Sequence, residues 1–169
     1  MKSLVLFAHG KESGPWGSKI KHLAQIAERL GANVLSPDYS SLQNPDDRVQ
    51  HLLALSLVPH FKLILVGSSM GGYVSTIASE KLKPAGLFLM APAFYLDGYR
   101  NQNPVSAAES TMIVAGWQDD VIPVEHSIRF ARQHRVELHL LDGDHRLNSV
   151  LLRLGELFEY FLAQVLSKP

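Results

Sequence analysis

The stretch KLILVGSSMGGY, residues 62–73, combines a strand, a tight turn and the start of a helix. Its first residues form the β-favouring apolar run Lys62–Val66, and helical spacing begins at Gly71. Between them GSSMG, residues 67–71, fits the pattern G-x-S-x-G, in which the serine occupies a strained turn and the glycines leave room for it. The stretch therefore predicts that the hydroxyl of Ser69 projects at the carboxyl end of a buried strand.

The same alternation of short apolar runs and longer amphipathic stretches extends along the whole chain. We expect strands at residues 3–8, 33–36, 62–66, 86–90, 111–115 and 136–141. We expect helices at residues 18–30, 46–58, 71–81, 124–133 and 148–166. Continuous apolar strands are typical of parallel sheets that are covered by helices on both faces. The pattern predicts an α/β protein with three α/β/α layers, a six-stranded parallel sheet and a single domain over residues 1–169.

A serine nucleophile needs a base within hydrogen-bond reach. The carboxyl ends of parallel strands carry the functional residues of such sheets, and DGDH, residues 142–145, directly follows the last predicted strand. The other seven histidines lie on predicted helices, inside or before a strand, or in the loop after the first strand. We therefore predict that His145 is the base for Ser69.

The base in turn needs a carboxylate that orients it. The segment GWQDDVIP, residues 116–123, follows the strand at 111–115 and contains two adjacent aspartates. We favour Asp119 over Asp120 because Asp119 lies three residues after the glycine and four before the proline. Turn and N-cap aspartates are common, so a purely structural role stays open for either residue.

A tetrahedral intermediate also needs N–H donors for its oxyanion. Met70, directly after the predicted nucleophile, supplies one backbone N–H. The loop after the first strand supplies the second, and we predict the N–H of Lys11, with Gly10 as the alternative. His9 is expected to brace this loop.

Taken together, these motifs resemble the α/β-hydrolase superfamily, and especially its small members without a cap domain. The matching segments, in chain order, are HG at 9–10, GSSMGG at 67–72, GWQDDVIP at 116–123 and GDH at 143–145. The resemblance implies the strand order 2-1-3-4-5-6, a triad in the order Ser, Asp, His, and no metal or organic cofactor. It implies hydrolysis of a carboxylic ester or thioester through an acyl-serine intermediate. Lys11 stands where many relatives carry an apolar or aromatic residue, which bears on substrate choice.

Substrate contacts are expected in the loops, because the chain has no room for a cap. Gly10, Phe94 and Tyr95 are the candidate substrate-binding residues. The two aromatic residues belong to a long irregular segment between predicted strands, and such segments are often functional. An equally acceptable interpretation is that Phe94 and Tyr95 only cover the core beneath them.

The composition narrows the functional classes. Hydrophobic residues make up 46% of the chain and charged residues 19%, which favours a folded domain with a sizeable core. Sixteen basic residues balance sixteen acidic ones, so no basic surplus points to nucleic acid. The chain has no cysteine, which excludes thiolate catalysis.

No apolar run reaches the length of a signal-peptide core or a membrane helix. We expect a soluble, cytoplasmic protein with a small-molecule substrate and no membrane partner.

Two other classes of function share parts of this pattern. A catalytically silent binding protein could keep the fold and engage a partner through the same pocket. A flavodoxin-like phosphate-binding domain would show the same alternation, but the chain lacks the G-K-[S/T] ending and the G-x-G-x-x-G pattern at its glycine-rich turn. Within the serine mechanism, a small acyltransferase is a further alternative if an alcohol replaces water.

Overall fold

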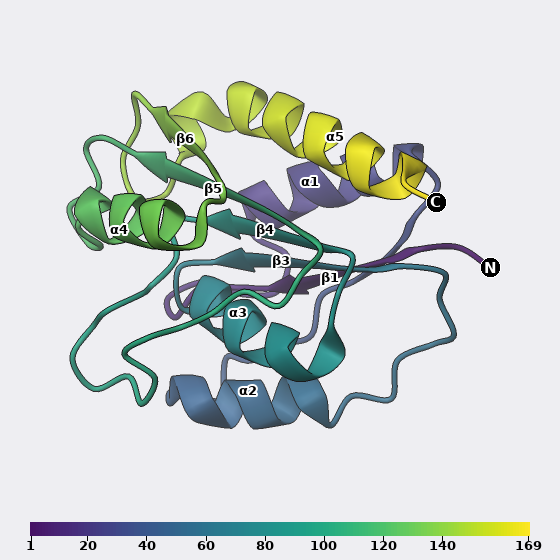
Figure 1. Ribbon diagram of the computed structural model, residues 1–169, viewed down its shortest axis with the longest axis horizontal. Helices are drawn as coiled ribbons and strands as arrows, with labels where there is room; N and C mark the ends of the chain where they lie inside the picture. The colour runs from purple at the N-terminus through teal and green to yellow at the C-terminus, as the bar shows by residue number, and fades with distance from the viewer.

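The computed structural model describes residues 1–169 and contains one sheet of six parallel strands (Figure 1). The strands are β1 (Leu4–Ala8), β2 (Asn33–Leu35), β3 (Leu63–Ser68), β4 (Gly86–Met90), β5 (Ser110–Gly116) and β6 (Glu137–Leu141). Their order across the sheet is β2-β1-β3-β4-β5-β6, and every neighbouring pair is parallel. The predicted fold class and strand order are therefore confirmed.

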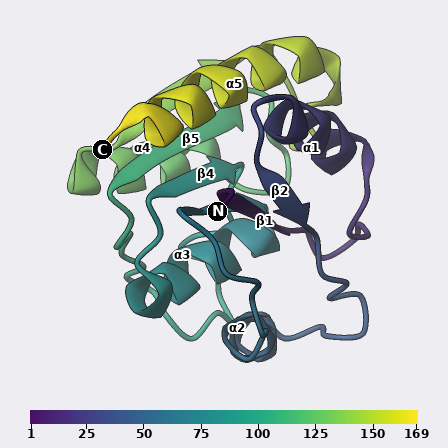
Figure 2. The same cartoon turned by 90° about the vertical axis from the view of Figure 1, so that its right-hand side faces the viewer.

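Helices cover both faces of the sheet. They are α1 (Ser18–Arg29), α2 (Pro45–Leu53), α3 (Met70–Leu82), α4 (Val124–His134) and α5 (Leu151–Ser167), the last preceded by a 3₁₀ turn (Asn148–Val150). Helices α1 and α5 lie side by side on one face, while α2, α3 and α4 cover the other (Figures 1 and 2). None of the helices is long and apolar enough to span a bilayer.

The central strands are buried on both faces, which explains their continuous apolar sequences. In β3, Ile64 and Val66 pack into the core beneath α1 and α5. Leu63 and Leu65 point the other way, into the core beneath α2, α3 and α4. Because side chains alternate along a strand, a run without polar residues can serve two cores at once.

One helix is shorter than its sequence pattern predicts. We expect a helix over residues 46–58, but α2 ends at Leu53. The helical pattern continues through Leu55 and Leu57, which are partly buried against the core in non-helical backbone. Pro59 disfavours helical geometry only at Val58, the residue before it. The chain leaves the helix after Leu53 and still buries Leu55 and Leu57 against the same core.

All strands run in one direction, so their carboxyl ends share one edge of the sheet. The loops after β1, β3, β5 and β6 leave from this edge. They carry the residues that the sequence singles out for chemistry.

Candidate active site

Ser69 lies on a strained turn between β3 and α3. Its φ of 54° and ψ of −117° are unfavourable for a residue with a Cβ atom, at a cost of about 1–3 kcal/mol. The backbone around it holds this geometry. Its N–H donates to the carbonyl of Met90 at 2.9 Å, and its own carbonyl accepts from Gly72 at 2.9 Å and from Ala93 at 3.0 Å. Helix α3, the end of β4 and the residues after it therefore hold the serine in its strained conformation.

The glycines of the motif are required by close backbone contacts. A Cβ atom on Gly71 would overlap the carbonyl oxygen of Ala8 in β1. A Cβ atom on Gly67 would overlap the carbonyl of Gly71 itself. Helix α3 can therefore begin directly against β1 and β3 only if both positions lack a side chain, which is the physical content of the G-x-S-x-G pattern.

The structure brings Ser69, His145 and Asp119 into one hydrogen-bonded chain. His145 Nε2 lies 3.1 Å from Ser69 Oγ, and His145 Nδ1 lies 2.8 Å from Asp119 Oδ2. A carboxylate only accepts hydrogen bonds, so Nδ1 carries the proton and Nε2 is left to accept from the serine hydroxyl. This is the tautomer that a general base for Ser69 requires.

Two backbone groups fix the carboxylate of Asp119. Its Oδ1 accepts from the N–H of Val121 at 2.9 Å and from that of Ile122 at 2.8 Å. Its side chain is only 2% exposed, whereas Asp120 is exposed and makes no side-chain hydrogen bond. Of the two adjacent aspartates, Asp119, which the sequence analysis favours, is the one beside His145.

The loops after β5 and β6 lie against each other, which places Asp119 next to His145. The N–H of Gln118 donates to the carbonyl of Gly143 at 3.0 Å. A Cβ atom on Gly116 would overlap that same carbonyl. Glycine at position 116 therefore allows the close approach of the two loops.

The predicted oxyanion donors flank the serine. Met70 is the first residue of α3 and Gly10 lies in the loop after β1. A Cβ atom on Gly10 would stand 3.6 Å from that of Ser69. Lys11 follows with an exposed side chain. Outside the helices and strands, no backbone hydrogen bond is donated by Gly10 or Lys11.

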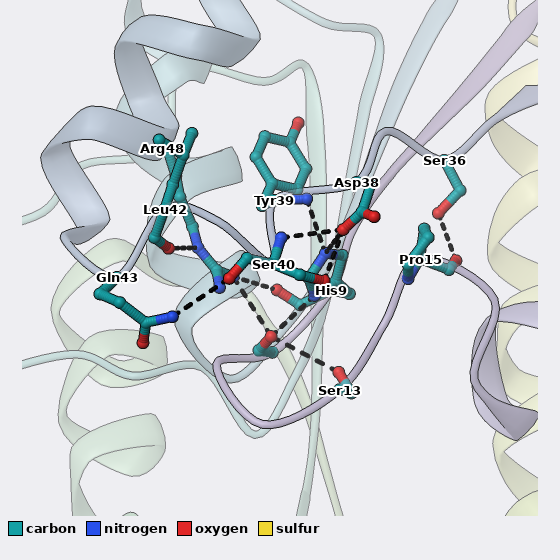
Figure 3. A network of polar contacts seen from close by, with 11 residues as sticks. His9, Ser13, Pro15, Ser36, Asp38, Tyr39, Ser40, Leu42, Gln43 and Arg48 are labelled. Atoms are coloured by element: carbon teal, nitrogen blue, oxygen red, sulfur yellow. Dashed lines mark hydrogen bonds and ion pairs between the residues drawn. The ribbon is translucent and has the colours of Figure 1, made fainter.

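His9 is buried and hydrogen-bonded on both ring nitrogens (Figure 3). Its Nδ1 lies 2.8 Å from the carbonyl of Gly10, which can only accept. Its Nε2 accepts from the N–H of Tyr39 at 2.9 Å. The ring is therefore neutral, and burial lowers the pKa of His9 below its ordinary value. With both nitrogens engaged, His9 anchors the loop after β1.

Lys19 is a feature of the site that the sequence did not single out. It lies in the first turn of α1, and its Nζ donates to Ser68 Oγ at 3.0 Å, beside the nucleophile. Burial lowers the pKa of Lys19 to about 8, opposed in part by the carboxylates of Asp144 and Asp119. Nothing in the helical pattern distinguishes this lysine from an exposed one.

The two aromatic candidates for substrate binding differ in their surroundings. Phe94 is fully buried and stacks on Phe130 with ring centroids 4.5 Å apart. Tyr95 is half-buried, and the guanidinium of Arg129 lies 3.9 Å above its ring. Phe94 thus packs in the core, as in the interpretation that assigned it a covering role, while Tyr95 keeps some exposed surface.

Comparisons with known proteins identify the family. A family model described as the alpha/beta hydrolase family matches residues 5–164. The chain belongs to the α/β-hydrolase family. A protein of this superfamily from Xanthomonas campestris pv. campestris is 30% identical, with a TM-score of 0.88 over 96% of this chain and 99% of its own. A search of curated proteins gives no match.

More distant solved structures share the fold. Est1E from Butyrivibrio proteoclasticus, also solved with ferulic acid bound, superposes on 99% of this chain and 89% of its own, with a TM-score of 0.82 and 16% identity. An α/β serine hydrolase without a lid, from Xanthomonas campestris, covers 99% of this chain and 84% of its own at 18% identity and a TM-score of 0.72. A protein of this fold without a lid is therefore known.

Proposed function

We propose that the chain is a serine hydrolase that cleaves small carboxylic esters or thioesters through an acyl-serine intermediate. The observation that carries the proposal is the hydrogen-bonded chain from Ser69 through His145 to Asp119. Family membership supports a hydrolase, and the strained position of the serine supports a nucleophile.

In the proposed mechanism Ser69 Oγ attacks the substrate carbonyl while His145 Nε2 takes the hydroxyl proton. Asp119 stabilises the resulting imidazolium without accepting its proton. The oxyanion accepts hydrogen bonds from the backbone N–H of Met70 and from that of Lys11, or of Gly10 instead of Lys11. His145 then gives the proton to the leaving alcohol or thiol, and the acyl-serine forms. A water molecule activated by the same histidine hydrolyses it and regenerates Ser69.

The loops around Ser69 carry no inserted domain, and this favours a small substrate. The strand-end loops leave directly from the sheet, and no inserted domain covers Ser69. The long segment between β4 and β5 contributes Tyr95, whose partly exposed ring is the aromatic surface that we propose for the acyl group.

Hydrolysis of a matched set of esters and thioesters tests the proposal. We expect the wild-type protein to hydrolyse p-nitrophenyl acetate or butyrate, or their thioester analogues, with saturation. Ser69→Ala should lose at least about 10³-fold in kcat, since loss of a triad member removes a concerted unit. Ser41→Ala, at an exposed serine, is the matched control and should keep wild-type rates. A folded wild-type protein that hydrolyses none of these substrates would favour the silent binding protein.

A further inference from the structure

Arg48 is a buried cation whose hydrogen bonds go to backbone carbonyls and not to a carboxylate. Its side chain is 0% exposed, which is rare for arginine, and no acidic group forms an ion pair with it. Its Nε donates to the carbonyl of Leu42 at 2.8 Å. Its Nη1 donates to the carbonyls of His9 at 3.0 Å and Gly10 at 3.2 Å (Figure 3). Helix α2 thus holds the loop after β1 through one guanidinium.

The carbonyl of Gly10 is the most heavily bonded group in this loop. Besides Arg48, it accepts from Nδ1 of His9 at 2.8 Å and, at the long distance of 3.5 Å, from the hydroxyl of Ser13. The ring of His9 is itself fixed by the N–H of Tyr39. The carbonyl therefore has one well-defined direction, toward Arg48 and His9.

The direction of a carbonyl sets that of the N–H in the same peptide. A peptide unit is planar and trans, so its C=O and N–H point in opposite directions. The carbonyls of His9 and Gly10 face the guanidinium, and the N–H groups of Gly10 and Lys11 are therefore turned away from it. These two N–H groups make no backbone hydrogen bond, and Gly10 approaches Ser69 closely. They are also the two candidates for the second oxyanion donor.

We propose that Arg48 is a positioning residue that aims the N–H groups of Gly10 and Lys11 at the oxyanion formed on Ser69. The inference rests on the proposed hydrolase function. Arg48 does not touch the substrate; it acts through the two peptides whose carbonyls it binds.

Burial of the Arg48 guanidinium is unfavourable for stability, which indicates that this residue does more than fill space. Burial of an unpaired cation is unfavourable, and it lowers the pKa of Arg48 below its ordinary value. One of its nitrogens, Nη2, is buried without any hydrogen-bond partner. A methionine would fill much of the same space without a buried charge, but it would leave the carbonyls that the guanidinium binds without that donor.

Steady-state kinetics of Arg48→Met and Arg48→Lys test the proposal on an ester that the wild-type protein hydrolyses. Loss of one oxyanion donor costs about 10²–10³-fold in kcat, and a misdirected donor is lost in part. We expect kcat to fall about 10- to 100-fold in Arg48→Met, with KM within about twofold. Arg48→Lys should recover part of kcat, because an ammonium still donates to carbonyls but lacks the planar fork. Arg132→Met, at an exposed arginine on α4, is the matched control and should keep both constants.

The outcomes separate this inference from the proposed function. A folded wild-type protein without any ester hydrolysis contradicts the proposed function before Arg48 is tested. An active wild-type protein with an unchanged kcat in folded Arg48→Met overturns only the role of Arg48. A rise in KM at constant kcat would also overturn it, since it would assign Arg48 to ground-state binding. If neither variant folds, Arg48 serves stability alone and the proposal fails.

Discussion

Replacement of Asp119 by asparagine exchanges one carboxylate oxygen for an NH₂ group and keeps the shape of the side chain. Two backbone N–H groups, those of Val121 and Ile122, point at Oδ1. The remaining carbonyl oxygen of the asparagine must accept from both of them, because an NH₂ group cannot. The NH₂ group then faces Nδ1 of His145, at the position where the carboxylate oxygen stood 2.8 Å away.

This reversed hydrogen bond fixes the wrong tautomer of His145. Nδ1 must accept from the amide, so the ring proton moves to Nε2, which can then no longer accept from Ser69 Oγ. In serine hydrolysis this loss of the base lowers kcat by about 10⁴-fold. The corresponding rise in the activation free energy is about 5 kcal/mol.

Esterase assays of Asp119→Asn and Asp120→Asn would measure the effect. Asp120 is exposed and free of side-chain hydrogen bonds, so its variant is the matched control and should stay within about twofold of the wild-type kcat. Circular dichroism would show that both variants fold. A kcat for Asp119→Asn within tenfold of wild type, or an equal loss in Asp120→Asn, would refute the reasoning from tautomers.

Three further predictions concern stability. Ser69→Gly should be inactive but about 1 kcal/mol more stable than Ser69→Ala in thermal unfolding, because glycine adopts a φ of 54° without strain; equal melting temperatures would count against strain at this turn. Gly71→Ala should fail to fold, since its Cβ overlaps the carbonyl of Ala8, whereas Gly14→Ala has open space and should leave expression and melting unchanged. The pKa of Lys19 falls from 10.5 to about 8 on folding, so the unfolded state binds more protons between these pH values and the free energy of unfolding rises with pH there. Urea denaturation across this window should show a smaller rise for Lys19→Met, and identical slopes would contradict the lowered pKa of Lys19 in the folded protein.

The sequence predicts most of the fold because its signals are local. The apolar run at residues 86–90 is a strand with the same limits in the structure, since a strand buried on both faces leaves a continuous apolar pattern. The end of α2 at Leu53 is missed because helical periodicity continues through leucines that pack in another conformation. The continuous apolar run of β1 indicates an interior strand, but its place between β2 and β3 follows only from the family resemblance.

Some residues of the candidate site can be predicted from the sequence and others cannot. Ser69 and His145 can be found from sequence, because a motif and a strand-end position mark them. Arg48 cannot be found, because it lies in an amphipathic helix beside Asp46 and Asp47, where an arginine is normally solvated. Its burial depends on the carbonyls of a loop 38 and 39 residues earlier in the chain, and only the packing of α2 against that loop shows it.

Labelling with a fluorophosphonate probe tests the central claim most directly, because the probe reacts only with an activated serine. The modified peptide must be fragmented so that Ser69 is distinguished from its neighbour Ser68. We expect one adduct, on Ser69 Oγ, that His145→Ala loses and that His139→Ala, at a histidine of β6, retains. No adduct on the folded wild-type protein, or an adduct that persists in His145→Ala, would contradict the assignment of Ser69 as a nucleophile activated by His145.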